Sequence, residues 1–423
     1  MLDIKKLQKD PKGYEKLLAS RGEQYPALVK KTVAAHSAFV EAQQAIETIK
    51  AKKNAFSRTI AQLSHAEKAT KLKELAQLTE QEKELTIRHE IAHKEMHEAL
   101  RVIPNIPASE TPVGKSDADN TVIKTVGDPP MFSFDPLDYV TLAERHKLID
   151  TERAAKVSGS RFGYLLGDGA LLWNALVQYT LSVITRKGFI PFFSPVLVRA
   201  EVMRDSGYDS YVEGGEAYYL KDDDLYLVGT GEHALLPFHR DEILSEDTLP
   251  RKYTTYSSCF RREAGSYGKD TKGILRVHQF EKQEMVVLCT PETSDTTFAE
   301  LVALQEHIIS GLGLPYHLLA VCTGDLPRPS AQVIDLECWI PSEKKYRETH
   351  SASNCTDYQA RDNNIRYKGA AGTQFVHILN ATAITPRTLI AILENYQLPD
   401  GSIGIPTVLQ PYLNGKKIIS QKD

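Results

Sequence analysis

The 423-residue sequence has little of what marks several classes of protein. It has only five cysteines and no CxxC pair, which argues against a zinc site or a disulfide framework and favours a reducing compartment. No apolar run approaches the roughly 20 residues that a membrane helix needs, and the first residues carry no apolar signal segment. We therefore expect a cytoplasmic protein that does not associate with membranes.

Strong net charge and the common nucleotide-binding motifs are also missing. The formal net charge is only -4, so any contact with RNA must use a local basic surface. Neither GxGxxG nor a P-loop occurs, so ATP, if used, is bound in neither the Rossmann nor the Walker mode. The composition, 42% hydrophobic and 25% charged, allows a sizeable core, and the length allows two or three domains.

Residues 29–100 contain no glycine or proline and follow a short, interrupted helical lead-in over residues 1–28. Most apolar residues recur at alternating intervals of three and four, first over residues 42–63 and then over residues 75–99. This spacing predicts two helices, each about 50 Å long, that pair as an antiparallel arm with its turn near residues 64–67. By itself such an arm is as well suited to oligomerisation or spacing as to binding.

Prolines and polar residues over 104–120 predict a linker that separates the arm, residues 1–103, from a second domain over residues 121–423. In that domain the predicted strands follow one another as neighbouring antiparallel pairs, with helices before and after and no βαβ rhythm. An amphipathic helix is predicted over residues 139–156 and a mostly apolar one over residues 170–187. The fold class is therefore α+β, an antiparallel sheet flanked by helices.

The most informative stretch runs from Ser257 to Met285, with SSCFRREAGS in its first half and GILRVHQFEKQEM in its second. It is predicted to form a strand, a long loop and a strand. In the returning strand His278, Phe280 and Glu284 share one face. Charged residues at the end of a strand are costly unless they meet a ligand or each other. Taken alone, this stretch is most simply a surface hairpin with salt bridges.

The stretch resembles motif 2 of the class II aminoacyl-tRNA synthetases, and in its wording the seryl-tRNA synthetases in particular. LNAT at residues 379–382, PRTL at 386–389 and LENYQ at 393–397 resemble motif 3 of the same family. A helix followed by an apolar, proline-bearing strand at residues 188–197 resembles motif 1, which implies a homodimer. Because the segments agree in order along the whole chain, the resemblance is far more specific than any one motif. It implies that residues 121–423 form a class II catalytic domain.

The resemblance also implies a site for ATP and Mg²⁺. Arg261 and Arg387 are the implied catalytic residues: Arg261 bridges the α-phosphate and the substrate carboxylate, and Arg387 covers one face of the adenine. Phe280 stacks on the other face, and Glu263 accepts a hydrogen bond from the adenine amino group. The further implied ATP contacts are Arg262, Arg276, Val277, Glu348, Thr349, His350 and Ser351, of which Glu348 and Ser351 also bind Mg²⁺. Without the resemblance, Arg387 reads as a helix-terminal residue paired with a carboxylate, and His350 could cap a loop.

For the amino acid, the resemblance implies an L-serine pocket beside Arg261. Thr230, Gly231 and Glu232 hold the ammonium group, and Glu284 and Thr382 bind the hydroxyl group. The interval from Thr382 to Arg387 is one residue shorter than is usual in the family.

The implied function is formation of seryl-adenylate and transfer of the seryl group to the terminal adenosine of tRNA(Ser). The arm would grip the long variable arm of the tRNA, and its candidate phosphate-binding cations are Lys30, Lys31, Lys50, Lys52, Lys53 and Arg58. Two alternatives stay open. One is a paralogue that activates a related small amino acid or loads a carrier protein, and the other is a non-catalytic coiled-coil interaction protein.

Overall fold

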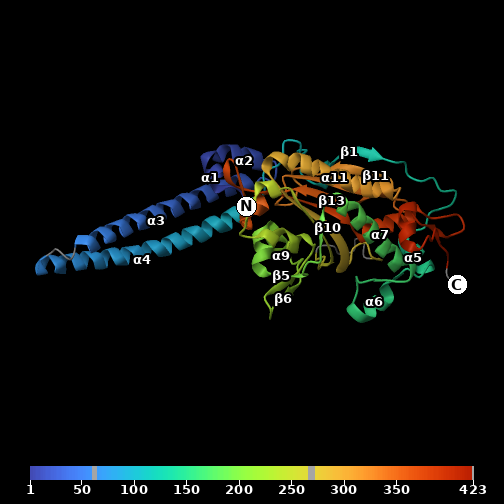
Figure 1. Ribbon diagram of the computed structural model, residues 1–423, viewed down its shortest axis with the longest axis horizontal. Helices are drawn as coiled ribbons and strands as arrows, with labels where there is room; N and C mark the ends of the chain where they lie inside the picture. Colours follow the sequence, from blue (N-terminus) through green and yellow to red (C-terminus); the bar gives the residue numbers. More distant parts are fainter. Residues whose placement is uncertain (60–63, 265–271, 422–423) are drawn as a thin grey trace. The chain divides into compact units, whose positions relative to one another are not determined.

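The computed structural model describes residues 1–59, 64–264 and 272–421, and its contacts divide the chain into two units, Met1–Ile106 and Pro107–Asp423 (Figure 1). Residues 265–271 of the predicted hairpin loop, and residues 60–63 in the stripe predicted for the first arm helix, lie outside the described residues. The segment over residues 107–120 hydrogen-bonds within the second unit. For example, the backbone N–H of Ala108 donates to the carbonyl oxygen of Ala331 at 2.8 Å.

In its described part the first unit contains helices joined by short turns and loops (Figure 1). Its helices are α1 (Ile4–Lys9), α2 (Pro11–Ala19), α3 (Tyr25–Thr59) and α4 (His65–Arg101). The last two pack along each other over most of their length, as the spacing of apolar residues predicted. Within the predicted stripe, Lys53 Nζ on α3 lies 2.7 Å from the carboxylate of Glu82 on α4.

The start of α4 differs from the prediction, which assigned residues 64–67 to the turn. The helix begins at His65, and the backbone N–H of Ser64 donates to the carboxylate of Glu67 at 2.9 Å. Serine followed three residues later by glutamate is a sequence pattern for a helix N-terminus, because the two residues can satisfy free backbone N–H groups.

The second unit is built on a sheet of eight strands in the order β1-β11-β12-β13-β16-β10-β9-β4. Neighbouring strands are antiparallel except β4, which runs parallel to β9. The predicted α+β fold with an antiparallel sheet is therefore confirmed, with β4 as the exception. The strands are β1 (Thr121–Val126), β4 (Ile190–Phe192), β9 (Arg251–Phe260), β10 (Gln279–Cys289), β11 (Tyr316–Ala320), β12 (Gln332–Ile340), β13 (Lys345–Asn354) and β16 (His377–Ile384).

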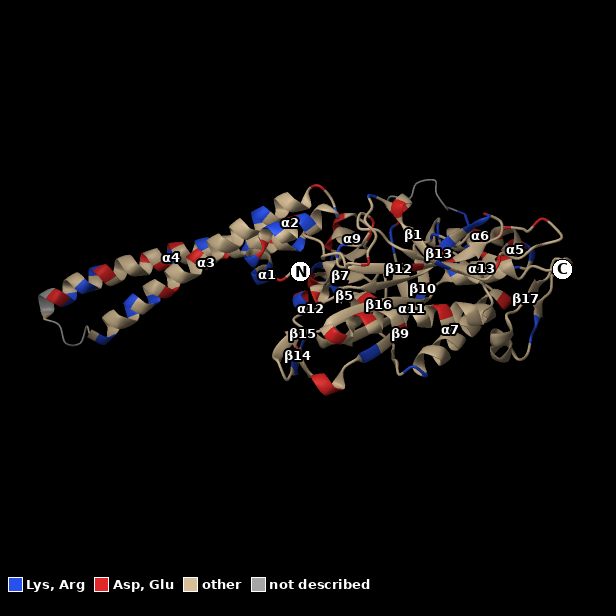
Figure 2. Cartoon of the chain, turned by 90° about the horizontal axis from the view of Figure 1, so that it is seen from above, with Lys and Arg blue, Asp and Glu red and all other residues tan. Residues whose placement is uncertain are grey.

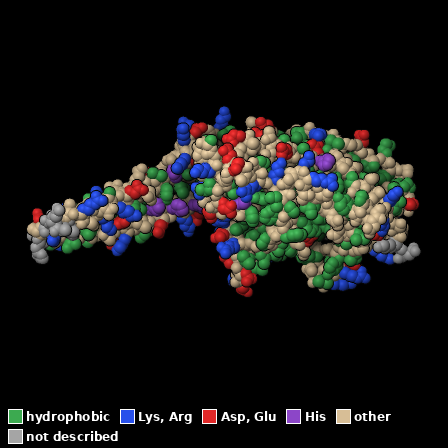
Figure 3. All heavy atoms as spheres, in the orientation of Figure 1, with side chains coloured by type: hydrophobic (Ala, Val, Ile, Leu, Met, Phe, Trp, Pro, Cys, Tyr) green, Lys and Arg blue, Asp and Glu red, His purple; other side chains and the backbone are tan. Residues whose placement is uncertain are grey.

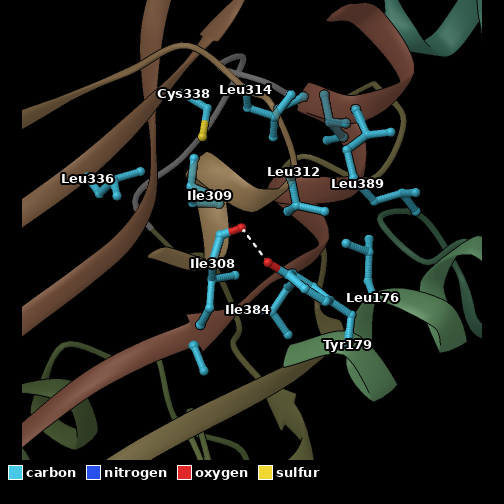
Figure 4. Packing of buried hydrophobic residues seen from close by; sticks show 14 of the residues in the cluster. Leu176, Tyr179, Ile308, Ile309, Leu312, Leu314, Leu336, Cys338, Ile384 and Leu389 are labelled. Atoms are coloured by element: carbon cyan, nitrogen blue, oxygen red, sulfur yellow. Dashed lines mark hydrogen bonds between the residues drawn. The ribbon is translucent and has the colours of Figure 1, made fainter. Parts of the chain in front are cut away.

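Three helices bury one face of this sheet: α7 (Asp168–Thr185), α11 (Ser294–Gly311) and α13 (Pro386–Asn395). Their apolar side chains meet in the main core, where the hydroxyl of Tyr179 on α7 donates to the carbonyl oxygen of Ile308 on α11 at 3.3 Å (Figure 4). On β10 Met285 and Val287 belong to this core. Because side chains alternate along a strand, Lys282 and Glu284 project from the opposite face of the sheet.

Shorter elements surround the sheet. The predicted helix over residues 139–156 is wrong: the chain forms α5 (Tyr139–Arg145), β2 (Ile149–Asp150) and α6 (Thr151–Ser158), with Lys147 at φ 55 between the first two. The remaining short elements are β3 (Tyr164–Leu165), β5 (Leu197–Arg199), α8 (Ala200–Met203), α9 (Asp209–Glu213), β6 (Tyr219–Leu220), β7 (Leu225–Leu227), α10 (Glu232–Leu235), β8 (Ile243–Ser245), α12 (Tyr358–Asp362), β14 (Arg366–Gly369), β15 (Gly372–Phe375), β17 (Ile403–Gly404) and β18 (Ile418–Ile419). Among the described residues, no helix has the length and apolar character needed to span a membrane.

Candidate active site

A cavity of about 560 Å³ lies on the sheet face that carries Lys282 and Glu284. Residues from β10, β13 and β16, from the start of α13 and from the segment that follows β9 line it together. The two arginines predicted to be catalytic, Arg261 and Arg387, are separated by 126 positions in the sequence and both reach this cavity. The other predicted site residues that line it are Thr230, Glu232, Glu263, Arg276, Val277, Phe280, Glu284, Glu348, Thr349, Ser351 and Thr382.

Two predicted ATP contacts lie elsewhere. The Nε of Arg262 donates to the carbonyl oxygen of Ala217 at 3.2 Å, and its guanidinium group lies 4.7 Å from the centre of the Tyr218 ring. His350 is buried, its Nε2 is 3.1 Å from the carbonyl oxygen of Ala383, and burial lowers its pKa to about 4. Neither residue lines the cavity, so the structure does not bring Arg262 and His350 together with the other predicted ATP contacts.

Gly231 does not line the cavity either, but its lack of a side chain shapes the floor. A Cβ atom at this position would lie 2.5 Å from a methyl group of Thr255 on β9. Glycine therefore lets the turn between Thr230 and Glu232 approach the sheet closely.

Arg261 follows the last residue of β9 and is held from two sides. Its Nε donates to the carbonyl oxygen of Gly229 at 3.1 Å, and its guanidinium carbon lies 5.3 Å from the centre of the Phe280 ring. The register of β9 and β10 pairs Cys259 with Phe280, which brings the ring beside the arginine. Nearby, Arg276 Nη1 donates to the carboxylate of Glu263 at 3.3 Å. The cavity thus has a fixed cation and an aromatic face within a few ångströms.

Arg387 lies in the first turn of α13, directly after Pro386. Its Nη1 donates to the backbone carbonyl oxygen of Glu348 at 2.9 Å and to the carboxylate of the same residue at 3.0 Å. The pairing with a carboxylate that the sequence alone allowed is therefore present, and it sits at the cavity.

Glu348 and Ser351 are three residues apart on β13, a spacing that normally turns side chains to opposite faces of a strand. The register between β12 and β13 shifts between Leu336 and Glu337, so that Thr349 is an extra residue on β13. Such a bulge returns Glu348 and Ser351 to the same face, and both line the cavity.

The surroundings of Glu348 and Ser351 fit a magnesium ion. Asp335 on β12 pairs with Ser351 in the register, and its Oδ1 is buried with no hydrogen-bond partner among the described residues. Burial, followed by repulsion from Glu348, raises the pKa of Asp335 to about 8. The described residues contain no cluster of three or more acidic, histidine or cysteine ligands. A magnesium site does not require such a cluster, because Mg²⁺ typically keeps few protein ligands and takes the rest from phosphate and water.

The predicted serine pocket is brought together by strand register. β10 and β16 pair Glu284 with Thr382, and β9 and β10 pair Glu284 with Thr255. The hydroxyl of Thr230 donates to Glu284 Oε2 at 3.1 Å. Glu232, in the first turn of α10, completes a small polar floor that is almost entirely withdrawn from solvent.

Glu232 is held by donors from distant segments. The hydroxyl of Tyr208 donates to its Oε1, and Asn380 Nδ2 donates to the same oxygen at 2.9 Å. Burial, followed by repulsion from Glu284, raises the pKa of Glu232 to about 7. A cationic group entering here would relieve that repulsion, so the floor is suited to an ammonium ion.

Sequence reasoning missed three residues that line the cavity, Lys282, Tyr208 and His233, and also Asp335, which pairs with the lining residue Ser351. Lys282 could have been found, because it alternates with Phe280 and Glu284 on one strand. Tyr208 carried no signal, since it ends a short π-helical segment, Arg204–Tyr208, that nothing in the sequence connects to Glu232. Burial lowers the pKa of His233 to about 3, so this residue lines the cavity as a neutral side chain.

Comparisons with known proteins agree with this geometry. A family model described as "Seryl-tRNA synthetase N-terminal domain" matches residues 1–107, and one described as "tRNA synthetase class II core domain (G, H, P, S and T)" matches residues 218–396. A "Serine--tRNA ligase" of Nocardia farcinica is 41% identical over 98% of both chains, and one of Paenarthrobacter aurescens is 42% identical over 99% of both.

Solved structures agree as well. The seryl-tRNA synthetase from Pyrococcus horikoshii, complexed with ATP, superposes with a TM-score of 0.93 at 35% identity and covers 100% of both chains. The cytoplasmic serine-tRNA ligase from Naegleria fowleri, in complex with AMP, has a TM-score of 0.88 at 32% identity and covers 100% of this chain and 99% of that one. The family predicted from the motifs is thereby confirmed, and the chain belongs to the seryl-tRNA synthetases of the class II aminoacyl-tRNA synthetases.

Proposed function

We propose that the protein activates L-serine and attaches it to tRNA(Ser). The serine carboxylate attacks the α-phosphate of ATP, the bond to the β-phosphate breaks, and seryl-adenylate and pyrophosphate form. A hydroxyl group of the terminal adenosine of tRNA then attacks the serine carbonyl carbon, and AMP leaves. The observation that carries this proposal is one cavity in which a fixed arginine, Arg261, adjoins the polar floor of Thr230, Glu232 and Glu284.

In this proposal ATP lies bent over the sheet between two guanidinium groups. Arg261 neutralises charge that develops on the α-phosphate and holds the serine carboxylate beside it. Phe280 and Arg387 cover the two faces of the adenine, and Glu263 accepts a hydrogen bond from its amino group. Arg276 reaches the outer phosphates, and the backbone at Val277 lines the pocket. A planar guanidinium suits both the phosphate contact and the stacking.

Glu348 and Ser351, together with Asp335, would hold Mg²⁺ beside the phosphates. The ion supplies charge neutralisation on phosphate oxygens when bound. The buried, unpartnered Oδ1 of Asp335 supports this assignment, because a carboxylate oxygen without a donor or a cation is costly in the interior. Arg387 then exchanges its pairing with Glu348 for the adenine.

The arm is proposed to bind tRNA through exposed cations on α3. Charges of both signs alternate along it, so the contact depends on particular residues rather than on net charge (Figure 2). Of the six candidates, Lys53 is paired with Glu82, and Lys30 lies 3.5 Å from Glu15. The other candidates, Lys31, Lys50, Lys52 and Arg58, are exposed.

Reversing Lys50, Lys52 and Arg58 together to glutamate is expected to weaken tRNA binding and lower the salt dependence of the affinity by about two to three counterions, since each phosphate contact releases close to one. Filter binding of tRNA(Ser) over a series of salt concentrations measures both. Serine-dependent pyrophosphate exchange is expected to stay within twofold. Reversing Lys73, Lys83 and Lys94 on α4 is the matched control, and an equal loss there would contradict the assignment to α3.

We further propose a homodimer formed through β4, the edge strand of the large sheet. Phe193 directly after β4 is 95% exposed, and Ile190 within it is also exposed. Hydrophobic side chains gather on the face of the second unit between α9 and α7 (Figure 3). Sedimentation is expected to give about 95 kDa, twice the 47.3 kDa of one chain, and Phe193→Asp to shift it towards the single-chain mass. A wild-type protein of single-chain mass at micromolar concentration would refute the dimer.

Serine-dependent exchange of labelled pyrophosphate into ATP tests the activity directly. Its absence with pure, folded protein would defeat the proposal. Comparing serine, glycine and alanine separates it from a paralogue for a related amino acid, and offering tRNA(Ser) as acceptor separates it from a carrier-protein loader. All five cysteines are buried and none forms a disulfide among the described residues, which supports our proposal that the enzyme works in the reducing cytoplasm.

A further inference from the structure

Lys282 is a mostly buried cation inside the cavity that the proposed mechanism does not yet use. It lies on β10 two residues before Glu284, so both side chains project from the same face of the strand. Its Nζ forms an ion pair with Glu284 Oε2, and the two side chains are only 12% and 1% exposed. Its Nζ also donates to the hydroxyl oxygen of Thr230 at 3.3 Å.

These contacts close a triangle. The Thr230 hydroxyl donates its proton to Glu284 at 3.1 Å, while its oxygen accepts from Lys282. The hydroxyl proton therefore points towards Glu284, and the Glu284 carboxylate is held by both Thr230 and Lys282. Lys282 links β10 to the turn before α10, which are the two elements that carry the polar floor.

The charges of the floor also balance only when Lys282 is counted. Glu232 and Glu284 bring two negative charges, and Lys282 leaves a net charge of minus one. The ammonium group of serine removes that remainder, while the serine carboxylate is matched by Arg261. Without Lys282 the floor would carry two uncompensated carboxylates, and a buried charge without a partner is strongly unfavourable.

The other titratable groups around this floor do not contribute charge near neutral pH. Burial lowers the pKa of His233 to about 3 and that of His350 to about 4. Burial also raises the pKa of the Cys259 and Cys355 thiols and of the Tyr208 hydroxyl. The four charged groups that remain are Glu232, Glu284, Lys282 and Arg261.

We propose that Lys282 is a positioning residue for the amino acid: its ammonium group orients Glu284 and Thr230 for the substrate and balances one of the two carboxylates. This inference rests on the proposed function, because serine is the ligand that Glu284 and Thr230 are oriented for. It acts through those two side chains and predicts an effect on serine alone. A lysine that merely stabilised the sheet would affect serine and ATP alike.

Lys282→Met is expected to raise the KM for serine about 10- to 100-fold in pyrophosphate exchange, with the KM for ATP changed less than about threefold. Lys252→Met is the matched control: this lysine on neighbouring β9 pairs with Glu300 at 3.0 Å outside the cavity, and both constants should stay within about twofold of wild type. A parallel rise of both KM values in Lys282→Met would overturn the inference.

A double-mutant cycle with Glu284→Gln tests whether Lys282 acts through Glu284. Lys282→Met alone leaves the Glu284 carboxylate without its cation. In the Glu284→Gln background that negative charge is already absent, so adding Lys282→Met should raise the serine KM by less than about threefold. The double variant keeps the net charge of minus one that the wild-type floor has, so it remains informative if Lys282→Met alone fails to fold. Equal effects of Lys282→Met in both backgrounds would overturn the coupling.

The pH profile gives a readout that a structural role would not move. Lys282 lowers the pKa of Glu232, which burial and Glu284 raise to about 7. Serine needs ionised Glu232, so wild-type kcat/KM for serine should fall as pH drops through about 7. In Lys282→Met that fall should begin at higher pH, and Lys282→Arg should return it. An unshifted profile overturns the inference, whereas absence of serine-dependent exchange in the wild type defeats the proposed function itself.

Discussion

Replacing Arg261 with lysine is expected to lower kcat for serine-dependent pyrophosphate exchange by about 10³-fold. The arginine is held before substrate arrives, by its bond to the Gly229 carbonyl oxygen at 3.1 Å and by the Phe280 ring. A lysine keeps the charge but has one point donor, so it cannot contact the α-phosphate and the serine carboxylate in a fixed geometry. Steady-state exchange with both substrates saturating measures kcat.

Arg361→Lys is the matched control for this prediction. Its guanidinium carbon lies 4.6 Å from the centre of the Phe375 ring, so it also stacks on a phenylalanine, yet it lies outside the cavity. Exchange in this variant is expected to stay within about twofold of wild type, because the stacking contact with Phe375 and the partly exposed pairing with Asp357 both lie outside the cavity. If Arg261→Lys kept more than a tenth of the wild-type kcat, the proposed role of Arg261 would be refuted.

Periodicity predicted the features that depend on neighbouring residues. Apolar residues at alternating intervals of three and four predicted the two arm helices, α3 and α4. The alternation of residue types with period two predicted the two faces of β10. Periodicity failed over residues 139–156, because a single backbone conformation at Lys147, with φ 55, ends α5 and no apolar spacing records it. Ser64 and Glu67 were likewise assigned to a turn, although serine followed three residues later by glutamate is a pattern for the start of a helix, and the hydrogen bond between them is present.

The site depended on information that local patterns do not hold. Glu348 and Ser351 share a face only because Thr349 is an extra residue on β13, and strand register is a property of two strands together. The pairing of Glu284 with Thr382 has the same origin. Family resemblance supplied those residues, but it also carried over Arg262 and His350, whose side chains lie outside the cavity.

Lys282 and Asp335 are residues that neither the local patterns nor the family resemblance assigned to the site. Their residue types invite a surface interpretation, and only burial reveals that one sits in the serine floor and the other beside Glu348. Tyr208 could not be found at all from sequence, because no local pattern connects it to its partner Glu232, which lies 24 positions further along the chain. The structure therefore adds most information about the residues that hold the predicted site residues in position.

Alanine is expected to be activated with a kcat/KM about 10⁴-fold below that of serine, measured by pyrophosphate exchange with each amino acid. Glu284, 1% exposed, and Thr382 face each other across β10 and β16 and are expected to bind the serine hydroxyl. Alanine offers no donor, so binding it would bury these polar groups without the hydrogen bonds that serine makes. Discrimination of this size arises from unpaired polar groups rather than from the small difference in volume.

Glu284→Gln is expected to lower kcat/KM for serine about 10²-fold while leaving the low value for alanine nearly unchanged, so that the ratio of the two collapses. Glu394→Gln is the matched control, because this buried carboxylate accepts from the backbone N–H groups of Tyr139 and Ser342 at 2.9 Å, outside the cavity. Its ratio should equal that of the wild type. Wild-type activation of alanine within about 100-fold of serine would instead favour a paralogue for a related small amino acid, since a floor built for a hydroxyl group cannot accept a methyl group so readily.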